Sequence, residues 1–297
     1  MEIWIVFTIA AAALQTLRFM LQKVLQGAGL SSGGATFARF LFAAPVACAV
    51  AAGSLWQAGL AIPVPPAGFW GFILVGGAAQ IVATFLTVSL FALRNFAVGV
   101  AFTKTETVQV AVFSVLLLGE RVGSVGWLAI GIGLAGVLLL SRTPEPRARF
   151  FGRAALYGLL AGGLFGLSAI GYRGATLALE PLPFLTRAVV ALAAATITQT
   201  VLMGLWLRWR EPGELGRVAR GWRRTLPVGV TGVLGSMGWF AAFSLQNAAF
   251  VRALGQVEIV FTLMASSLFF RERLSGREGA GIALVVLSVL VLILGAR

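Results

Sequence analysis

Two glutamates stand near the middle of long apolar segments. Glu106 lies within the segment Ala97–Leu118, and Glu258 lies within Ala248–Phe270. A charged side chain at the centre of a bilayer costs about 2.5–3.5 kcal/mol on insertion scales, so such residues are retained mainly for a function or for a buried partner. Either carboxyl group is therefore a candidate for binding and releasing a proton, or for binding a substrate. The alternative is that each glutamate is the structural partner of a buried arginine.

Further polar residues surround Glu106. Lys104 precedes it by two residues, about 200° around a helix, so the two side chains are expected on different faces. Thr103 and Gln109 share the Glu106 face and could line a polar cavity with it. Gln256 stands two residues before Glu258, where the first half has Lys104. A charge present in only one half favours a role of Lys104 in substrate binding or coupling, and a scaffold role is the alternative.

Arginines also lie inside the apolar segments. Arg39 and Arg187 are each about two turns from a segment end. They are expected to neutralise the glutamates, to contact an anionic group of the substrate, or to extend to the membrane surface. Arg18 and Arg252 are nearer the ends, and we expect their side chains to reach the interface. With Lys104, five basic residues face two acidic ones inside the membrane, which favours a carboxylate-bearing or zwitterionic metabolite, such as an amino acid.

Trp239 is the tryptophan that lies in the middle of an apolar segment. Its ring is a candidate for stacking on a flat substrate, and packing is the alternative. The other seven tryptophans lie at or near segment ends, where aromatic side chains prefer the headgroup level.

Composition predicts an integral membrane protein. Of 297 residues, 59% are hydrophobic and 11% are charged, whereas soluble domains carry about 25% charged residues. Ten helices of about 20 residues each would use most of the chain. We therefore expect an all-α protein of the inner (plasma) membrane of bacterial type, which crosses the bilayer with Ile3–Gln22, Gly33–Ala52, Gly68–Ala92, Ala97–Leu118, Ser124–Ser141, Arg153–Tyr172, Leu182–Leu207, Thr225–Gln246, Ala248–Phe270 and Gly276–Gly295.

The formal charge of +13 reflects loop arginines rather than a nucleic-acid partner. Fifteen Lys and Arg residues fall in the odd-numbered loops and three on the opposite side. This bias predicts odd loops in the cytoplasm and both termini outside. The chain has no His and one cysteine, Cys48, so we expect neither a metal site nor an internal disulfide.

The two halves of the chain repeat. Asn95 returns as Asn247, Glu106 as Glu258, and Glu120 as Glu272, all at an offset of 152 residues. The expected domains are residues 1–145 and 146–297, each with five spans. Because five is odd, the second half enters the membrane from the opposite side, as in carriers with inverted repeats. Both halves are in one chain, so a monomer is sufficient, while a dimer stays open.

With these features the chain resembles the drug/metabolite transporter superfamily, in its ten-helix EamA-type branch. The resemblance rests on the two five-span repeats, on Gly119-Glu120 at the end of the fourth span, and on the small residues of the fifth and tenth spans. It implies carrier-mediated movement, usually export, of small metabolites or drugs. The second half departs from the pattern, with Arg271-Glu272 in place of Gly-Glu.

Other motifs predict structure rather than chemistry. Glycines spaced by three or four residues, such as Gly229, Gly232, Gly235 and Gly238, let helices approach closely in lipid. The run Gly131–Gly136 matches a dinucleotide fingerprint but lies within a span, without the strand that such a site needs. No cofactor is expected.

The function expected from sequence is a secondary transporter that works by alternating access, with proton coupling through the two glutamates. The alternatives are a broad exporter of amphipathic drugs, an integral-membrane enzyme acting on lipids, and a membrane scaffold that transports nothing. The enzyme is disfavoured because the chain lacks His and Asp.

Overall fold

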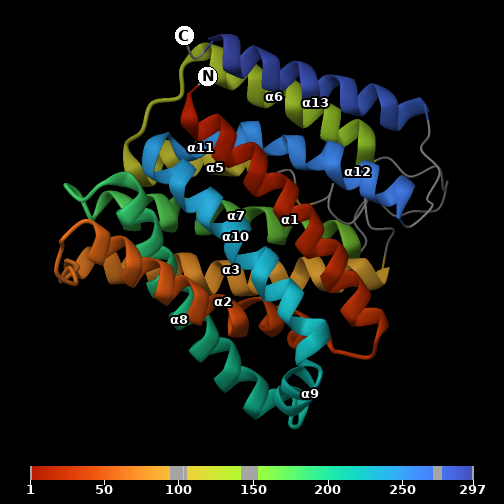
Figure 1. The fold of residues 1–297 in the computed structure, drawn as a ribbon. Coiled ribbons are helices and arrows are strands. Elements are labelled where there is room, and N and C mark those ends of the chain that lie inside the picture. Colours follow the sequence, from red (N-terminus) through yellow and green to blue (C-terminus); the bar gives the residue numbers. More distant parts are fainter. Residues whose placement is uncertain (1, 94–102, 104–105, 142–152, 270–275, 296–297) are drawn as a thin grey trace.

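The computed structural model describes residues 2–93, 103, 106–141, 153–269 and 276–295. Lys104, Asn95 and the expected domain boundary at residues 145 and 146 lie outside these ranges. The described elements are helical (Figure 1). In the first half they are α1 (Ile3–Gly27), α2 (Ser32–Gln57), α3 (Ala67–Leu93), α5 (Glu106–Leu118) and α6 (Ser124–Ser141).

The described elements of the second half are helical as well. These are α7 (Arg153–Leu177), α8 (Phe184–Arg210), α9 (Glu214–Arg220), α10 (Trp222–Leu245), α11 (Ala248–Leu254), the 3-10 helix η2 (Gly255–Val257), α12 (Glu258–Leu268) and α13 (Gly276–Gly295). The short helix α9 lies where the sequence suggests only a loop. The segment expected as one ninth span is interrupted by η2, so α11 and α12 are two shorter helices.

Six described helical segments are long and apolar enough to cross a membrane. Five of them belong to α1, α2, α3, α8 and α10, and the sixth is Ala248–Ala265, which runs through α11, η2 and most of α12. Three shorter apolar helices correspond to α5 and to parts of α6 and α13. Large apolar side chains lie on the outside, with Leu116 72% exposed and Leu205 65% exposed. Arginines and glutamates are buried inside. This distribution is what a lipid-facing surface around a polar interior requires.

The two halves interlock rather than stand apart. The most extensive helix interfaces are α3 with α7, α6 with α13, α1 with α10, and α2 with α8. Each joins a helix of one half to a helix of the other. The third helix of each half packs on the first helix of the other, and the second and fifth helices pack on their counterparts. This exchange is the pattern expected for two halves related by a pseudo-two-fold axis.

Figure 1 shows how this interlocking looks in space. The helices α6 and α13 run side by side along one edge, and α1 lies beside α10 across the middle. In this view α9 lies at the opposite end of the molecule from α6 and α13.

Glycines permit the closest helix contacts. A Cβ atom on Gly171 of α7 would lie 2.7 Å from the Cα of Gly76 on α3. Along α10, a Cβ on Gly238 would lie 2.9 Å from the Cβ of Ala11 on α1. In α6, a Cβ on Gly136 would lie 2.8 Å from a backbone oxygen of α13. The glycine spacing of α10 and the rejected fingerprint in α6 thus both serve helix packing.

Replacement of Gly171 by Ala should destabilise the protein, because the added methyl group meets backbone atoms that cannot move aside cheaply. We expect a loss of about 1–3 kcal/mol, measured as a lower melting temperature in detergent. Gly71→Ala in α3 is the matched control, since nothing lies within 4 Å of a Cβ there. Equal melting temperatures for the two variants would contradict the close contact between α3 and α7.

Candidate functional site

The two glutamates singled out in the sequence are both buried inside the helix bundle. Glu106 is 2% exposed and begins α5, while Glu258 is fully buried and begins α12. Glu106 forms an ion pair with Arg252 of α11. The guanidinium of Arg252 in turn lies over the ring of Trp239 on α10, 4.5 Å from its centroid. Arg252 is 9% exposed, so the expectation that its side chain reaches the membrane surface is wrong.

Trp239 connects this ion pair to the second glutamate. Its indole Nε1 donates a hydrogen bond to Oε1 of Gln15 on α1, at 3.0 Å. The Nε2 of Gln15 donates to Oε2 of Glu258, at 2.9 Å. Glu106, Arg252, Trp239, Gln15 and Glu258 therefore form a continuous chain of contacts, which we call the polar bridge. It draws on helices of both halves.

The interruption of the ninth span places Glu258 at the beginning of α12. The 3-10 turn η2 starts at Gly255, and a Cβ there would lie 2.7 Å from Cη2 of the Trp239 ring. Glycine therefore lets the indole approach the backbone at the break. Thr103, which precedes Glu106 by the same three residues, is also in a 3-10 turn. Broken helices of this kind surround substrate sites in carriers with inverted repeats.

A small cavity adjoins the polar bridge. Its free volume of about 20 Å³ is room for about one water molecule. The wall combines polar residues of the bridge with aromatic rings: it is lined by Gln15, Gln80, Phe165, Ser168, Ala169, Tyr172, Ser236, Trp239, Phe240, Phe243 and Arg252.

A second polar cluster forms the far wall of this cavity. The hydroxyl of Tyr172 on α7 donates to Oε1 of Gln80 on α3, at 2.7 Å. Gln199 of α8 donates to both Gln80 and Tyr172, each at 2.9 Å. The Tyr172 ring packs on Phe240, with 4.3 Å between centroids. The cavity thus offers hydroxyl, amide and guanidinium groups beside apolar rings.

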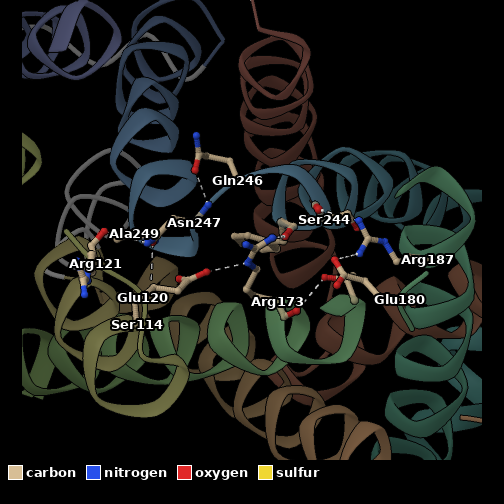
Figure 2. A network of polar contacts seen from close by, with 12 residues as sticks. Ser114, Glu120, Arg121, Arg173, Glu180, Arg187, Ser244, Gln246, Asn247 and Ala249 are labelled. Carbon is tan, nitrogen blue, oxygen red and sulfur yellow. Dashed lines mark hydrogen bonds and ion pairs between the residues drawn. The ribbon is translucent and has the colours of Figure 1, made fainter. Parts of the chain in front are cut away.

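Two arginines hold the carboxyl end of α10 (Figure 2). Arg173 of α7 bonds Oε1 of Glu120 at 2.9 Å and donates to the carbonyl oxygen of Phe243 at 2.5 Å. Arg187 of α8 pairs with Glu180 and donates to the carbonyl oxygen of Ser244 at 3.2 Å. Cations favour a helix carboxyl end because its last carbonyls lack partners within the helix. Since Phe243 also lines the cavity, this cluster adjoins the cavity wall.

Asn247 belongs to the same region. Its side-chain oxygen accepts a hydrogen bond from the Ala249 backbone N–H at 2.8 Å, so Asn247 caps the N-terminus of α11. Its amide nitrogen donates to the carbonyl oxygen of Arg121 at 3.5 Å. Figure 2 shows that the cap lies beside Glu120. Glu120 is paired with Arg173 rather than with its neighbour Arg121.

The remaining site residues expected from sequence are spread around this region. Thr103 is buried. Gln109 is partly buried against α7, where its amide oxygen meets the position of a Cβ on Gly163. Gln256 is 1% exposed, and neither of its amide atoms has a hydrogen-bond partner among the described residues. A Cβ on Gly133 would lie 2.6 Å from that amide.

The arginines differ in their surroundings. Arg187 belongs to the cluster at the end of α10 and does not contact either intramembrane glutamate. Arg39 donates to Thr84 and Ser236, so it lies beside the cavity. Arg18 is 2% exposed and donates to Gln22, which contradicts the expectation that it extends to the membrane surface.

Sequence reasoning missed several residues of the site. Charge did not single out four of them, because they are uncharged: Gln15, Gln80, Tyr172 and Gln199. Each is nevertheless a polar residue in an apolar segment, and this pattern in the sequence could have indicated them. The partnership of Arg252 with Glu106 joins residues 146 positions apart, and nothing in the local pattern of either segment reveals it.

Inverted halves, a broken helix and a polar cavity between the halves are features typical of membrane transporters built from inverted repeats. The sequence profile of the EamA-like transporter family matches residues 2–142 and again residues 152–294. The chain belongs to this family, within the drug/metabolite transporter superfamily, and is a multi-pass membrane transporter with two EamA domains. Because this is a family of transporters, the alternative of an integral-membrane enzyme acting on lipids is rejected.

A solved structure described as the crystal structure of a protein has the same fold. It superposes with a TM-score of 0.70 over 98% of this chain and 97% of the other, at 17% sequence identity. Similarity at this level of identity is limited to the fold. The expected fold class, an all-helical membrane protein with inverted repeat halves, is confirmed.

Removal of Arg252 should deprive the buried Glu106 carboxylate of this ion pair. We expect Arg252→Gln to destabilise the protein by about 3–5 kcal/mol, the usual cost of breaking a buried ion pair from one side. Glu106→Gln combined with Arg252→Gln should recover most of this loss. Thermal denaturation of the single and double variants in detergent measures the coupling, and purely additive effects would contradict a direct ion pair.

Proposed function

We propose that this transporter is a secondary exporter of the inner membrane, which moves a small carboxylate-bearing or zwitterionic metabolite by alternating access with proton coupling. The observation that carries the proposal is the polar bridge, which connects two buried carboxyl groups along the wall of one cavity. Burial of an ionisable group at this depth costs free energy, and in membrane proteins such groups commonly mark a substrate or proton pathway.

The small size of the cavity supports the proposal of alternating access. Room for about one water is too little for a metabolite, so the helices must separate for a substrate to enter. We propose that this conformation is occluded. Opening at the end shown in Figure 2 would require Arg173 to leave Glu120 or the carbonyl oxygen of Phe243. Since one half is the inverted copy of the other, exchange of their conformations would open the opposite end.

Proton coupling is proposed through the polar bridge. Protonation of Glu106 would remove the charge that holds Arg252. Arg252 would then be free to leave the Trp239 ring, whose indole fixes Gln15 on Glu258. One proton could thereby change contacts that reach from α5 to α12. Thr103, Gln109, Gln256 and Lys104 remain proposed contributors to substrate or proton binding.

The substrate class is proposed from charge. Arg252 lines the cavity, Arg39 donates to the lining residue Ser236, and Arg18 is buried beside Arg39. Two carboxylates accompany these three guanidinium groups, since Glu106 pairs with Arg252 and Glu258 accepts from Gln15. An excess of positive charge disfavours a simple organic cation. The aromatic wall, with Phe165, Phe240 and Phe243 beside Trp239, favours the second candidate, an exporter of amphipathic drugs.

Replacement of Glu258 or Glu106 by Gln should abolish coupling, because Gln neither binds nor releases a proton. In liposomes that enclose a pH-sensitive dye, we expect substrate-driven proton flux to fall to about a tenth of wild type or less. Pools of amino acids, organic acids and amphipathic cations, added under an imposed pH gradient, would identify the substrate class in the same assay.

Glu2→Gln is the matched control, since Glu2 is exposed at the beginning of the chain. It should transport as wild type does. Undiminished proton flux in both Glu106→Gln and Glu258→Gln would refute coupling through these residues. Flux with the amphipathic cations alone would support the drug exporter.

The proposed orientation places both termini outside and the loop that contains α9 in the cytoplasm, according to the bias of basic residues. Val64, between α2 and α3, is 94% exposed, and Arg220 at the end of α9 is also exposed. In a Cys48→Ser background, Val64→Cys should react with a membrane-impermeant maleimide in intact cells. Arg220→Cys should react only after the membrane is permeabilised.

The two cysteine variants control for one another, since Val64→Cys should be labelled under both conditions and Arg220→Cys only after permeabilisation. Labelling of Arg220→Cys but not Val64→Cys in intact cells would contradict the proposed orientation and indicate the opposite one.

A further inference from the structure

Two buried arginines from neighbouring helices converge on one glycine. Arg18 of α1 is 2% exposed and Arg39 of α2 is 3% exposed. A Cβ atom on Gly232 of α10 would lie 3.1 Å from Cγ of Arg39 and 3.4 Å from Cδ of Arg18. Both side chains therefore pass over the same point of α10, where a Cβ would crowd them.

The hydrogen-bond partners of both guanidinium groups are neutral. Arg39 donates to the hydroxyl groups of Thr84 at 3.1 Å and Ser236 at 3.3 Å. Arg18 donates through Nη1 to Gln22 at 2.7 Å, and its Nη2 has no hydrogen-bond partner in the described parts of the chain. Within those parts, neither arginine forms an ion pair.

This pair of like charges lies in an apolar environment. The charge of Arg18 is repelled by Arg39 and attracted by Glu258. The second intramembrane glutamate, Glu106, forms its ion pair with Arg252. Removal of two cations from water is costly unless negative charge accompanies them. An additional anion would satisfy this requirement.

The pair also adjoins the central cavity. Ser236, which accepts a hydrogen bond from Arg39, lines that cavity. Gln15 lines it as well, and it lies three residues before Arg18 on the same helix, about one turn away. A ligand in an enlarged cavity would therefore meet the donors of Arg39 and the unbonded Nη2 of Arg18.

We propose that Arg18 and Arg39 form the subsite that binds the oxyanion of the transported molecule, with the hydroxyl group of Ser236 beside them. This inference rests on the proposed function and adds the residues that recognise the substrate's negative group. Guanidinium groups suit the binding of an oxyanion because they present several N–H donors in one plane to a carboxylate or phosphate. Gly232 is needed because a larger residue would push the two side chains apart.

The test compares anions with neutral compounds of similar shape. Purified wild-type protein in nanodiscs is heated with benzoate, N-acetyl-l-leucine or succinate, each beside its neutral amide, and with inorganic phosphate, all at about 10 mM. Unfolding is followed by tryptophan fluorescence. We expect at least one anion to raise the melting temperature while its neutral counterpart does not, because a ligand bound only to the folded state stabilises it. Carboxylate and phosphate arms distinguish the two kinds of oxyanion.

The same measurement on Arg18→Gln and Arg39→Gln should show at least a tenfold weaker apparent affinity, equivalent to about 1.4 kcal/mol. Arg18→Lys and Arg39→Lys retain the charge and should retain part of the affinity, which controls for variants that fold poorly. Arg210→Gln removes an equal charge at an exposed position and should bind as wild type does.

Two outcomes would overturn the subsite. One is that no anion stabilises wild-type protein more than its neutral counterpart. The other is that the stabilisation survives in Arg18→Gln and Arg39→Gln. The proposed transport is tested separately in the liposomes: proton-coupled flux of a neutral or cationic compound would leave the carrier mechanism intact while the anion subsite fails.

Discussion

Charge in an apolar interior is the constraint on which this structure depends. A guanidinium or carboxylate away from water must be paired within the protein, and here such contacts determine which helices meet. Glu106 joins α5 to α11 through Arg252, and Glu258 joins α12 to α1 through Gln15. At the end of α10, Arg173 and Arg187 satisfy carbonyl oxygens that no helix bond can reach. The polar contacts therefore act as specific connections in a bundle that exposes many large apolar side chains on its outer surface.

The same contacts are suited to change. A hydrophobic interface of equal size would hold the helices in one arrangement, whereas an ion pair weakens when one partner is protonated or when a competing ion arrives. Arg252 is shared between a carboxylate and an aromatic ring, and Trp239 is shared between Arg252, Gln15 and the backbone at Gly255. A change at any member of the polar bridge is thus felt by the others, as coupling between a proton and a substrate requires.

Each of the inverted halves contributes the glutamate at one end of the polar bridge, Glu106 or Glu258. Since α3 packs on α7 and α1 packs on α10, each half supplies helices to both sides of the cavity. The repeat is strict for Glu106 and Glu258 but not for their partners: one meets a cation and the other an amide. Similar backbones thus carry unlike side chains, and this asymmetry allows the two glutamates different tasks in one transport cycle.

The sequence by itself determined the membrane class, the two halves and their offset, and the two buried glutamates. Hydrophobicity and repeat spacing are properties of the chain, and a charge within an apolar segment is visible without coordinates. The tertiary structure decided which groups meet. It placed Arg252 on Glu106, brought Gln15 and Trp239 between the glutamates, and turned Arg18 inward beside Arg39. Periodicity locates a residue on its own helix, whereas the neighbour it faces depends on how distant helices pack, and interfaces lined by glycine set that packing.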